Sequence, residues 1–284
     1  MGKTILLCGA SGFIGGHVKA RLESLGHEVV PLRRGLPAAI EGRPEAIINC
    51  AAELVDESKM IESNVELVHT LIDLAVKWHI DKVIQVGSSS EYGPTNEIRR
   101  EDMTCVPSTA YERTKLTATE WVCASAWTKD IDACVARPFS VYGPNETPRK
   151  LIPQLWDHLM DGRTFELHDG SHDFIYIDDF VDGIVALLDA PREVTKGEIF
   201  NFGSGRSTSN QEVLAAFQEA ANEMKLGCSI TYHLNPKPFR PYDVTNWQAD
   251  ISKAARVLEW RPKVSFKDGL KRYMDWRWFE GDKG

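Results

Sequence analysis

The 284-residue sequence has no apolar run approaching the roughly 18 residues that cross a bilayer, so no membrane-spanning helix is expected. The first apolar stretch runs only over residues 5–8 before glycines interrupt it, which argues against a signal peptide. Cations are also few, because 33 Lys and Arg face 41 Asp and Glu, for a net charge of −8. An acidic chain of this kind is a poor binder of nucleic acid or of an anionic membrane.

Cysteine and histidine patterns that would hold a metal are missing as well. The six cysteines form no C-x-x-C pair, and the eight histidines show no metal-ligand spacing. We therefore expect no metal, and we interpret the cysteines as reduced, structural thiols in a cytoplasmic protein. A catalytic or metal-binding cysteine is the alternative. Hydrophobic residues make up 43% of the chain and charged residues 26%, which is typical of globular proteins.

Strand and helix patterns alternate along the first half of the chain. Strands are expected at 4–8, 27–32, 46–49, 82–87 and 131–137, and helices at 13–25, 61–76 and 110–127. This alternation predicts an α/β fold of the Rossmann type, a doubly wound parallel sheet with helices on both faces. Only about 13 residues separate the second and third strands, too few for a crossover helix and strand, so the sheet is expected to lack one element there.

A glycine-rich turn joins the first strand to the first helix, with the spacing G-x-x-G-x-x-G. Gly9 permits a tight turn, Gly12 lets the backbone approach a pyrophosphate, and Gly15 lets the helix pack on the strand. The helix N-terminus adds N–H groups and a positive dipole end. With a strand before it and a helix after it, the turn predicts a dinucleotide site. The expected contacts there are Gly9, Ser11, Gly12, Phe13, Ile14 and Gly15.

The choice of cofactor is expected at the end of the second strand, where an acidic residue would bind the adenosine ribose hydroxyls. This chain has Arg33 and Arg34 after Leu32 instead. Two guanidinium groups fit a 2′-phosphate, so the sequence favours NADP(H) over NAD(H). The alternative is that both arginines are solvated surface residues.

Tyr111 and Lys115 begin the helix expected at 110–127, four residues apart and so on one face. A nearby cation favours the phenolate and would lower the pKa of Tyr111 from about 10, which makes it a general acid/base candidate. A surface pair is the alternative. Ser88 follows the strand at 82–87, at the edge where open parallel sheets bind ligands. Its hydroxyl would stabilise a carbonyl oxygen that becomes anionic on hydride addition, and a plain polar turn is the alternative.

These motifs occur in the order found in the extended short-chain dehydrogenases/reductases, NAD(P)-dependent enzymes that act on nucleotide sugars. The chain resembles that family over nearly its whole length, with further matching stretches at 49–52, 137–144, 172–179, 200–205, 240–243 and 260–262. The resemblance implies that Ser88 polarises the sugar carbonyl, that Tyr111 is the proton donor, and that Lys115 binds the nicotinamide ribose.

The resemblance also implies contacts outside these three residues. Cofactor contacts are expected from Ala51, Ala52 and Pro138, and substrate contacts from Ser88, Ser89, Ser90, Ser140, His172 and Arg240. The arginine would hold the diphosphate of a nucleoside-diphosphate sugar. His172 stands where many relatives have a diphosphate-binding arginine, and a plain turn residue is the alternative for it. A homodimer formed through helices 61–76 and 110–127 is the usual assembly of the family.

Departures from the family pattern narrow the expected reaction. The 4,6-dehydratases have an acid and a glutamate directly after the catalytic serine or threonine, where this chain has Ser89 and Ser90, with Glu91 one position too late. The GDP-fucose synthases have a cysteine at Ser90 and a histidine at Asn145. The UDP-galactose 4-epimerases keep an acidic residue at Arg33. We therefore expect NADPH-dependent reduction of a nucleoside-diphosphate 4-keto-6-deoxyhexose in deoxysugar biosynthesis, with a nucleotide-sugar epimerase that retains NAD as the alternative.

A protein of another class is also compatible with this fold, because fold alone does not determine function. It would be a non-catalytic, NADP-sensing binding protein, against which the intact Ser88, Tyr111 and Lys115 argue. Two domains are expected: residues 1–145 would bind NAD(P), with 173–202 returning to that domain, and 146–284 would form a smaller C-terminal lobe for the nucleotide sugar. Proline and glycine punctuate the shorter segments of this second half.

Overall fold

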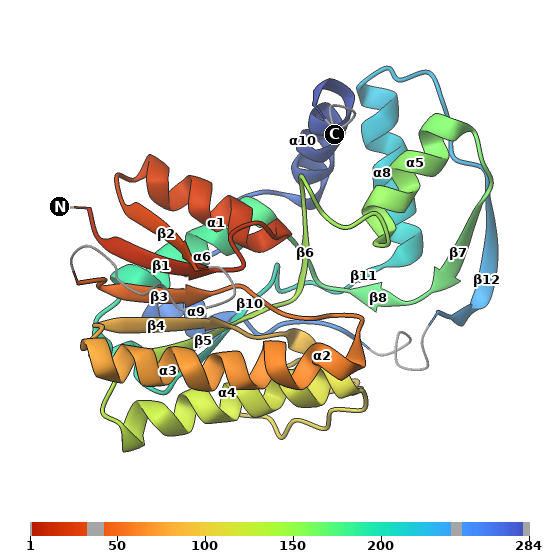
Figure 1. Ribbon diagram of the computed structural model, residues 1–284. Helices are drawn as coiled ribbons and strands as arrows, with labels where there is room; N and C mark the ends of the chain where they lie inside the picture. The colour runs from red at the N-terminus through yellow and green to blue at the C-terminus, as the bar shows by residue number, and fades with distance from the viewer. Residues whose placement is uncertain (1, 33–42, 240–245, 281–284) are drawn as a thin grey trace.

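The computed structural model describes residues 2–32, 43–239 and 246–280. Six strands form a parallel sheet in the order β10-β5-β4-β3-β1-β2 (Figure 1). Their bounds are β1 Thr4–Cys8, β2 Glu28–Leu32, β3 Ala46–Asn49, β4 Lys82–Val86, β5 Ala133–Pro138 and β10 Ile199–Phe202. The strand order reverses at β1, as in doubly wound nucleotide-binding sheets. The predicted Rossmann-type α/β fold is confirmed.

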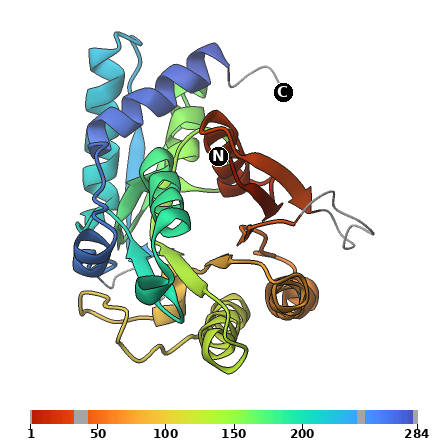
Figure 2. The ribbon, with the colours of Figure 1, turned by 90° about the vertical axis from the view of Figure 1, so that its left-hand side faces the viewer.

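Helices cover both faces of the sheet because the strand side chains alternate between two apolar layers. The helices α1 (Phe13–Ser24) and α6 (Ile177–Asp189) lie on one face, with Val18 and Ile184 packed in the same cluster as Ile5. On the other face lie α3 (Leu67–Trp78) and α4 (Ala110–Thr128), whose Ile72 and Val122 pack with Leu6 (Figure 2).

The helix expected at 61–76 begins earlier than the periodicity indicates. It comprises α2 (Glu57–Ile61), a π-helical turn η1 (Glu62–Glu66) and α3. The Asp56 side chain accepts the N–H of Ser58 at 3.1 Å and caps α2, which explains the earlier start. At the edge of the sheet, β2 has no neighbour beyond it among the described residues, and residues 33–42, where an element is expected to be missing, lie outside the described ranges.

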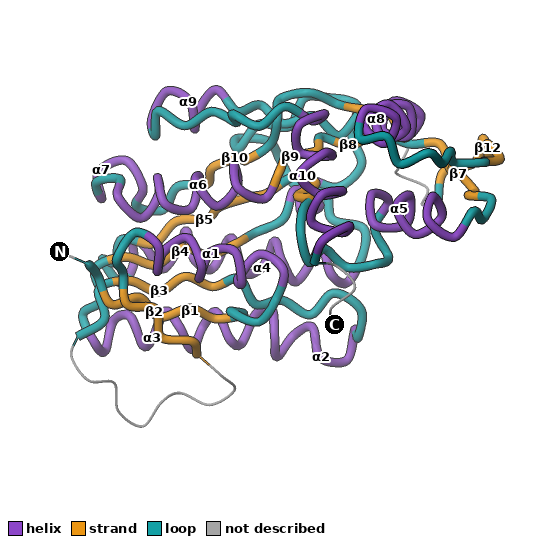
Figure 3. The backbone as a smooth tube through the Cα atoms, turned by 90° about the horizontal axis from the view of Figure 1, so that it is seen from above, coloured by secondary structure: helices purple, strands orange, loops and turns teal. Residues whose placement is uncertain are grey.

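A second group of elements lies beyond the carboxyl ends of the sheet strands (Figures 1 and 3). It contains α5 Leu151–Asp161, α8 Asn210–Glu223, α10 Phe266–Phe279, and the parallel pair β7 Phe165–Asp169 and β12 Tyr232–Pro238. Short pairs connect it to the sheet: β6 Ser140–Tyr142 with β9 Phe174–Tyr176, and β8 Ser171–His172 with β11 Thr208–Ser209. The remaining helices are α7 Arg192–Thr195 and α9 Ser252–Val257.

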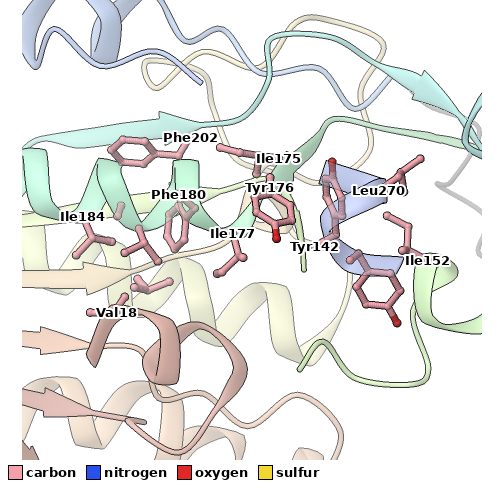
Figure 4. Packing of buried hydrophobic residues seen from close by; sticks show 14 of the residues in the cluster. Val18, Tyr142, Ile152, Ile175, Tyr176, Ile177, Phe180, Ile184, Phe202 and Leu270 are labelled. Carbon is pink, nitrogen blue, oxygen red and sulfur yellow. The ribbon is translucent and has the colours of Figure 1, made fainter. Parts of the chain in front are cut away.

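One hydrophobic cluster runs from the sheet into this second group without a break. Figure 4 shows Val18 of α1 and Ile184 of α6 at one end, and Ile152 of α5 and Leu270 of α10 at the other, with Tyr142 of β6 near the latter. All five side chains are fully buried or nearly so. The two expected domains therefore share a core, and their boundaries stay a prediction. Within the described ranges, the helices are all too short or too polar to cross a membrane.

Candidate active site

The glycine-rich turn has a geometry that only glycine permits. Gly9 has a φ of +73°, and a Cβ there would lie 2.7 Å from the backbone nitrogen of Ala51. A Cβ on Gly15 would lie 2.0 Å from the carbonyl oxygen of Gly9. Gly12 is the N-cap of α1, where no side chain makes a capping hydrogen bond and the first turn has no acidic residue. The turn therefore fits a pyrophosphate bound by backbone N–H groups.

The other residues of the turn and of the segment beside it differ in how exposed they are. Ser11 is exposed, whereas Phe13 and Ile14 are half-buried at the start of α1. The segment after β3 runs beside the turn, with Ala51 half-buried and Ala52 exposed. The structure thus brings together the cofactor contacts predicted on β1, α1 and β3.

Asn49 holds that neighbouring segment, and sequence analysis missed it. Its side-chain amide donates to Gln85 Oε1 at 2.8 Å, and its Oδ1 accepts the N–H of Ala51 at 3.0 Å. Both amide side chains are buried at the ends of apolar strands. A polar residue in each of two adjacent buried strands was the signal in the sequence, because buried amides need partners.

Ser88, Tyr111 and Lys115 meet at the carboxyl end of β4. Ser88 is the N-cap of the short helix η2 (Ser89–Tyr92), and its Oγ lies 2.7 Å from Ser90 Oγ. The Tyr111 phenol faces the side chain of Ser88, which lowers the pKa of the phenol. Lys115 is buried, and its Nζ donates to the carbonyl oxygen of Val86 at 2.6 Å. This arrangement has the parts needed to exchange a proton with a hydroxyl or carbonyl oxygen near Ser88.

The electrostatics of this cluster correct one expectation. Burial, together with the charges of Glu91 and Glu112, raises the pKa of Tyr111 to about 12, against the lowering effect of the Ser88 side chain. Burial lowers the pKa of Lys115, and Glu91 opposes that shift. The expectation that Lys115 lowers the pKa of Tyr111 is wrong. The Lys115 ammonium donates to the Val86 carbonyl oxygen, and the pKa of Tyr111 is raised.

The predicted substrate contacts lie on several elements. Ser89 and Ser90 belong to η2 and are half-buried beside Ser88. Pro138 ends β5 and is buried, and the N–H of Ser140 on β6 donates to the carbonyl oxygen of Asp173 at 2.9 Å. Three of the predicted contacts, Arg33, Arg34 and Arg240, lie outside the described residues.

His172 lies on β8 in an aromatic stack. Its ring is stacked on that of Trp247 with centroids 6.4 Å apart, and the Arg99 guanidinium covers the Trp247 ring at 3.7 Å. The loop around it is fixed by the buried Asp173, which accepts the N–H groups of Gly205 and Ala249, each at 3.0 Å. The described ranges contain no cluster of His, Cys, Asp or Glu able to hold a metal ion.

A Rossmann sheet with this glycine turn and with serine, tyrosine and lysine at its carboxyl edge defines an enzyme of the short-chain dehydrogenase/reductase type. The chain belongs to the NAD dependent epimerase/dehydratase family, whose model matches residues 5–203.

Several of the relatives are named as nucleotide-sugar enzymes. A dTDP-glucose 4,6-dehydratase of Streptomyces griseus is 30% identical over 82% of this chain and 71% of its own. A variant of the UDP-glucuronic acid 4-epimerase of Bacillus cereus, solved with UDP-4-deoxy-4-fluoro-glucuronic acid and NAD, is 25% identical with a TM-score of 0.83, covering 96% of this chain and 98% of its own. The dTDP-glucose 4,6-dehydratase DesIV of Streptomyces venezuelae, solved with NAD, is 25% identical with a TM-score of 0.82, covering 98% and 99%.

The predicted preference for NADP(H) is wrong. The family is NAD dependent, and the epimerase and dehydratase structures both hold NAD. The prediction rested on Arg33 and Arg34, whose guanidinium groups would fit a phosphate but are equally stable in water at the surface. The presence of two arginines at positions 33 and 34 is therefore not enough to identify the cofactor.

Proposed function

We propose that the chain is an NAD-dependent nucleotide-sugar 4-epimerase. The sequence favoured a 4-ketoreductase, with an epimerase as the alternative. The relatives support the epimerase better, since epimerases and dehydratases recur among them. Within that pair, the active site favours the epimerase, because a 4,6-dehydratase needs free acidic groups next to the catalytic serine or threonine.

Glu91 is the acidic residue nearest Ser88 in the sequence, and it is already engaged. One carboxylate oxygen lies 2.6 Å from Arg137 Nη2, and the other accepts the N–H of Ser88 at 2.7 Å. The side chain is fully buried. A carboxylate held in this way is not available to protonate a leaving hydroxyl group. Because both oxygens of Glu91 are engaged, we propose epimerisation and not dehydration.

The chain's own residues would act on the sugar hydroxyl at C4. Bound NAD would supply a hydride acceptor that also returns the hydride. Tyr111 would take the hydroxyl proton and return it, while the Ser88 hydroxyl would hold the same oxygen. Lys115 would exchange its bond to the Val86 carbonyl for the nicotinamide ribose. The glycine turn and the start of α1 would bind the pyrophosphate.

The test is the product formed from UDP-glucose, UDP-glucuronate and dTDP-glucose with added NAD. Proton NMR is expected to show the C4 epimer of one of these substrates, with no net change in nicotinamide absorbance. A 4-keto-6-deoxy sugar would instead identify a dehydratase and contradict the proposal. Net consumption of NADH with a 4-keto-6-deoxy substrate, and no epimer, would support the reductase.

We also propose that two copies associate through α3 and α4. This face carries exposed apolar side chains, including Ile61 at its start and Val76 and Trp121 along it, at 56%, 38% and 37% exposure. The Trp121 ring packs against the ring of His69 with centroids 4.1 Å apart, so α3 and α4 form one surface. Several exposed apolar side chains on one pair of helices are typical of a protein interface.

The substitution W121E is expected to convert a dimer into a monomer, because it would bury a charge in an apolar interface. Light scattering after size exclusion would measure the mass. W278E is the matched control, since Trp278 lies on α10 away from this face and is 52% exposed. A dimer that persists in W121E would exclude the α3/α4 interface.

A further inference from the structure

A fully buried ion pair lies next to the catalytic serine. Arg137 Nη2 is 2.6 Å from Glu91 Oε2, and the two side chains are 1% and 0% exposed. Removing two charges from water costs more than burying apolar side chains of the same volume, so such a pair does not by itself stabilise a fold. A role in the active site would explain why this position holds two charges.

Glu91 connects the pair to the catalytic turn through its other oxygen. Glu91 Oε1 accepts the N–H of Ser88 at 2.7 Å, and Ser88 Oγ accepts the N–H of Ser90 at 3.2 Å. These reciprocal bonds form a capping box around η2. A Cβ on Gly87 would lie 2.8 Å from Glu91 Oε1, so the carboxylate lies directly against the end of β4. The Ser88 backbone is therefore held by the carboxylate.

Arg137 fixes the carboxylate from the neighbouring strands. It lies on β5, and its guanidinium carbon is 4.3 Å from the centroid of the Tyr92 ring. The Tyr92 hydroxyl in turn donates to Asn201 Oδ1 on β10 at 2.8 Å. The position of the carboxylate is thus set by β4, β5 and β10 together, and not by the exposed loop that follows η2.

The negative charge of Glu91 acts on Tyr111 and Lys115, the two catalytic groups that titrate. It raises the pKa of Tyr111 and also that of Lys115. The other groups facing these two are Glu112 of α4, the Cys50 thiol after β3 and the Ser88 hydroxyl. Cys105, Cys123 and Tyr92 face the ion pair itself. Among the described residues, Arg137 is not one of the groups that shift the pKa of Tyr111 or Lys115.

We propose, resting on the proposed epimerisation, that Glu91 and Arg137 are a positioning pair for this active site. Glu91 orients Ser88 and places one fixed negative charge behind Tyr111 and Lys115. Arg137 holds that charge in place without touching the substrate. The pair sets the pH range in which Tyr111 can exchange a proton with the sugar.

The double variant E91Q/R137M separates this role from simple stabilisation. Glutamine keeps an oxygen that can accept the Ser88 N–H, and methionine fills the space of the guanidinium without charge. E91Q alone leaves a buried guanidinium unpaired, so its Tm is expected to fall, and the Tm is expected to recover in the double variant. The pH profile of single-turnover NAD reduction is expected to be shifted from that of the wild type in both variants.

The sign of that shift follows from the charge that is removed. The negative charge of Glu91 raises the pKa of Tyr111, so without it the base form of Tyr111 persists to lower pH. The acid limb of single-turnover NAD reduction is therefore expected about one pH unit lower in E91Q and in E91Q/R137M than in the wild type. A recovered Tm with an unshifted acid limb in E91Q/R137M would show that the pair is only structural, and would overturn the proposal.

A matched control pair lies on the same two strands. Lys82 begins β4 and Asp132 directly precedes β5, so this pair lies at their amino ends, and its side chains are 8% and 4% exposed. Lys82 Nζ is 3.1 Å from Asp132 Oδ2. D132N and K82M/D132N are both expected to lower the Tm, since Lys82 Nζ also donates to the carbonyl oxygens of Leu187 and Ala190, with the acid limb unchanged in both. A shifted limb in these controls would attribute the effect to lost stability and contradict the proposal.

Two further measurements keep the test decisive. If E91Q/R137M does not fold, E91D takes its place, because it keeps the charge but shortens the side chain. E91D is expected to have a reduced kcat, because the carboxylate no longer reaches the Ser88 N–H, and an acid limb near that of the wild type, because the charge is kept. An acid limb shifted as far as in E91Q would contradict the proposal. Ultraviolet titration of Tyr111 in the NAD complex, taken as the difference from Y111F, needs no substrate. It would still test the pair if no sugar nucleotide were turned over and the proposed function failed.

Discussion

Y111F is expected to lose about 10³-fold in turnover while still binding NAD, a loss of roughly 4 kcal/mol of transition-state stabilisation. The phenol faces the Ser88 side chain, and burial raises its pKa to about 12. The ring itself packs at the start of α4, and phenylalanine would preserve that packing. Catalysis should therefore fail without loss of the fold.

The measurement is kcat for C4 epimerisation, together with NAD affinity from fluorescence titration. Y232F is the matched control, because Tyr232 is a half-exposed tyrosine on β12, in the second group of elements, and its substitution should leave kcat unchanged. Retention of more than a tenth of the wild-type kcat in Y111F would remove Tyr111 as the proton carrier.

G15A is expected to weaken NAD binding at least tenfold and to lower the Tm by about 5 °C or more. The added Cβ would lie 2.0 Å from the carbonyl oxygen of Gly9, which is backbone and cannot rotate away. Either α1 moves away from β1 or the turn opens, and both changes displace the N–H groups that would hold the pyrophosphate. Calorimetry and NAD titration would measure the two effects.

The next residue in the same helix provides the control. A Cβ on Gly16 would meet its nearest atom, the carbonyl oxygen of Ala10, at 3.7 Å, an ordinary contact. G16A should therefore leave NAD binding unchanged and raise stability by about 0.5–1 kcal/mol, because alanine favours the helix over glycine. Equal losses in G15A and G16A would show that the effect does not come from the contact with Gly9.

The parts of the fold that depend on local pattern were predictable. Thr4–Cys8 and Ala46–Asn49 are buried parallel strands, and their short apolar runs bounded by polar residues mark both ends in the sequence. The glycine turn was predictable because φ and close approach restrict Gly9 and Gly15 individually. Each of these features is determined within a few residues of the chain.

Features that depend on distant partners were missed or misinterpreted. The role of Glu91 requires Arg137, a strand and a helix further along the chain, and nothing near Glu91 in the sequence indicates that partner. The pKa of Tyr111 was expected to fall because Lys115 is four residues away, whereas burial and the bond from Lys115 to Val86 reverse the result. The cofactor error has the same origin, since Arg33 and Arg34 were assigned a partner from their residue type alone.

The position of β10 in the sheet has a consequence for synthesis of the chain. This strand pairs with β5 but follows it only after the α5, β7 and α6 segments. At about 5–20 residues per second, the ribosome needs roughly 3 to 13 seconds to pass from Pro138 to Phe202. During that time the backbone edge of β5 is uncovered and can pair with another nascent chain. Slower translation of this stretch should therefore increase aggregation, and a chaperone that shields strand edges should relieve it.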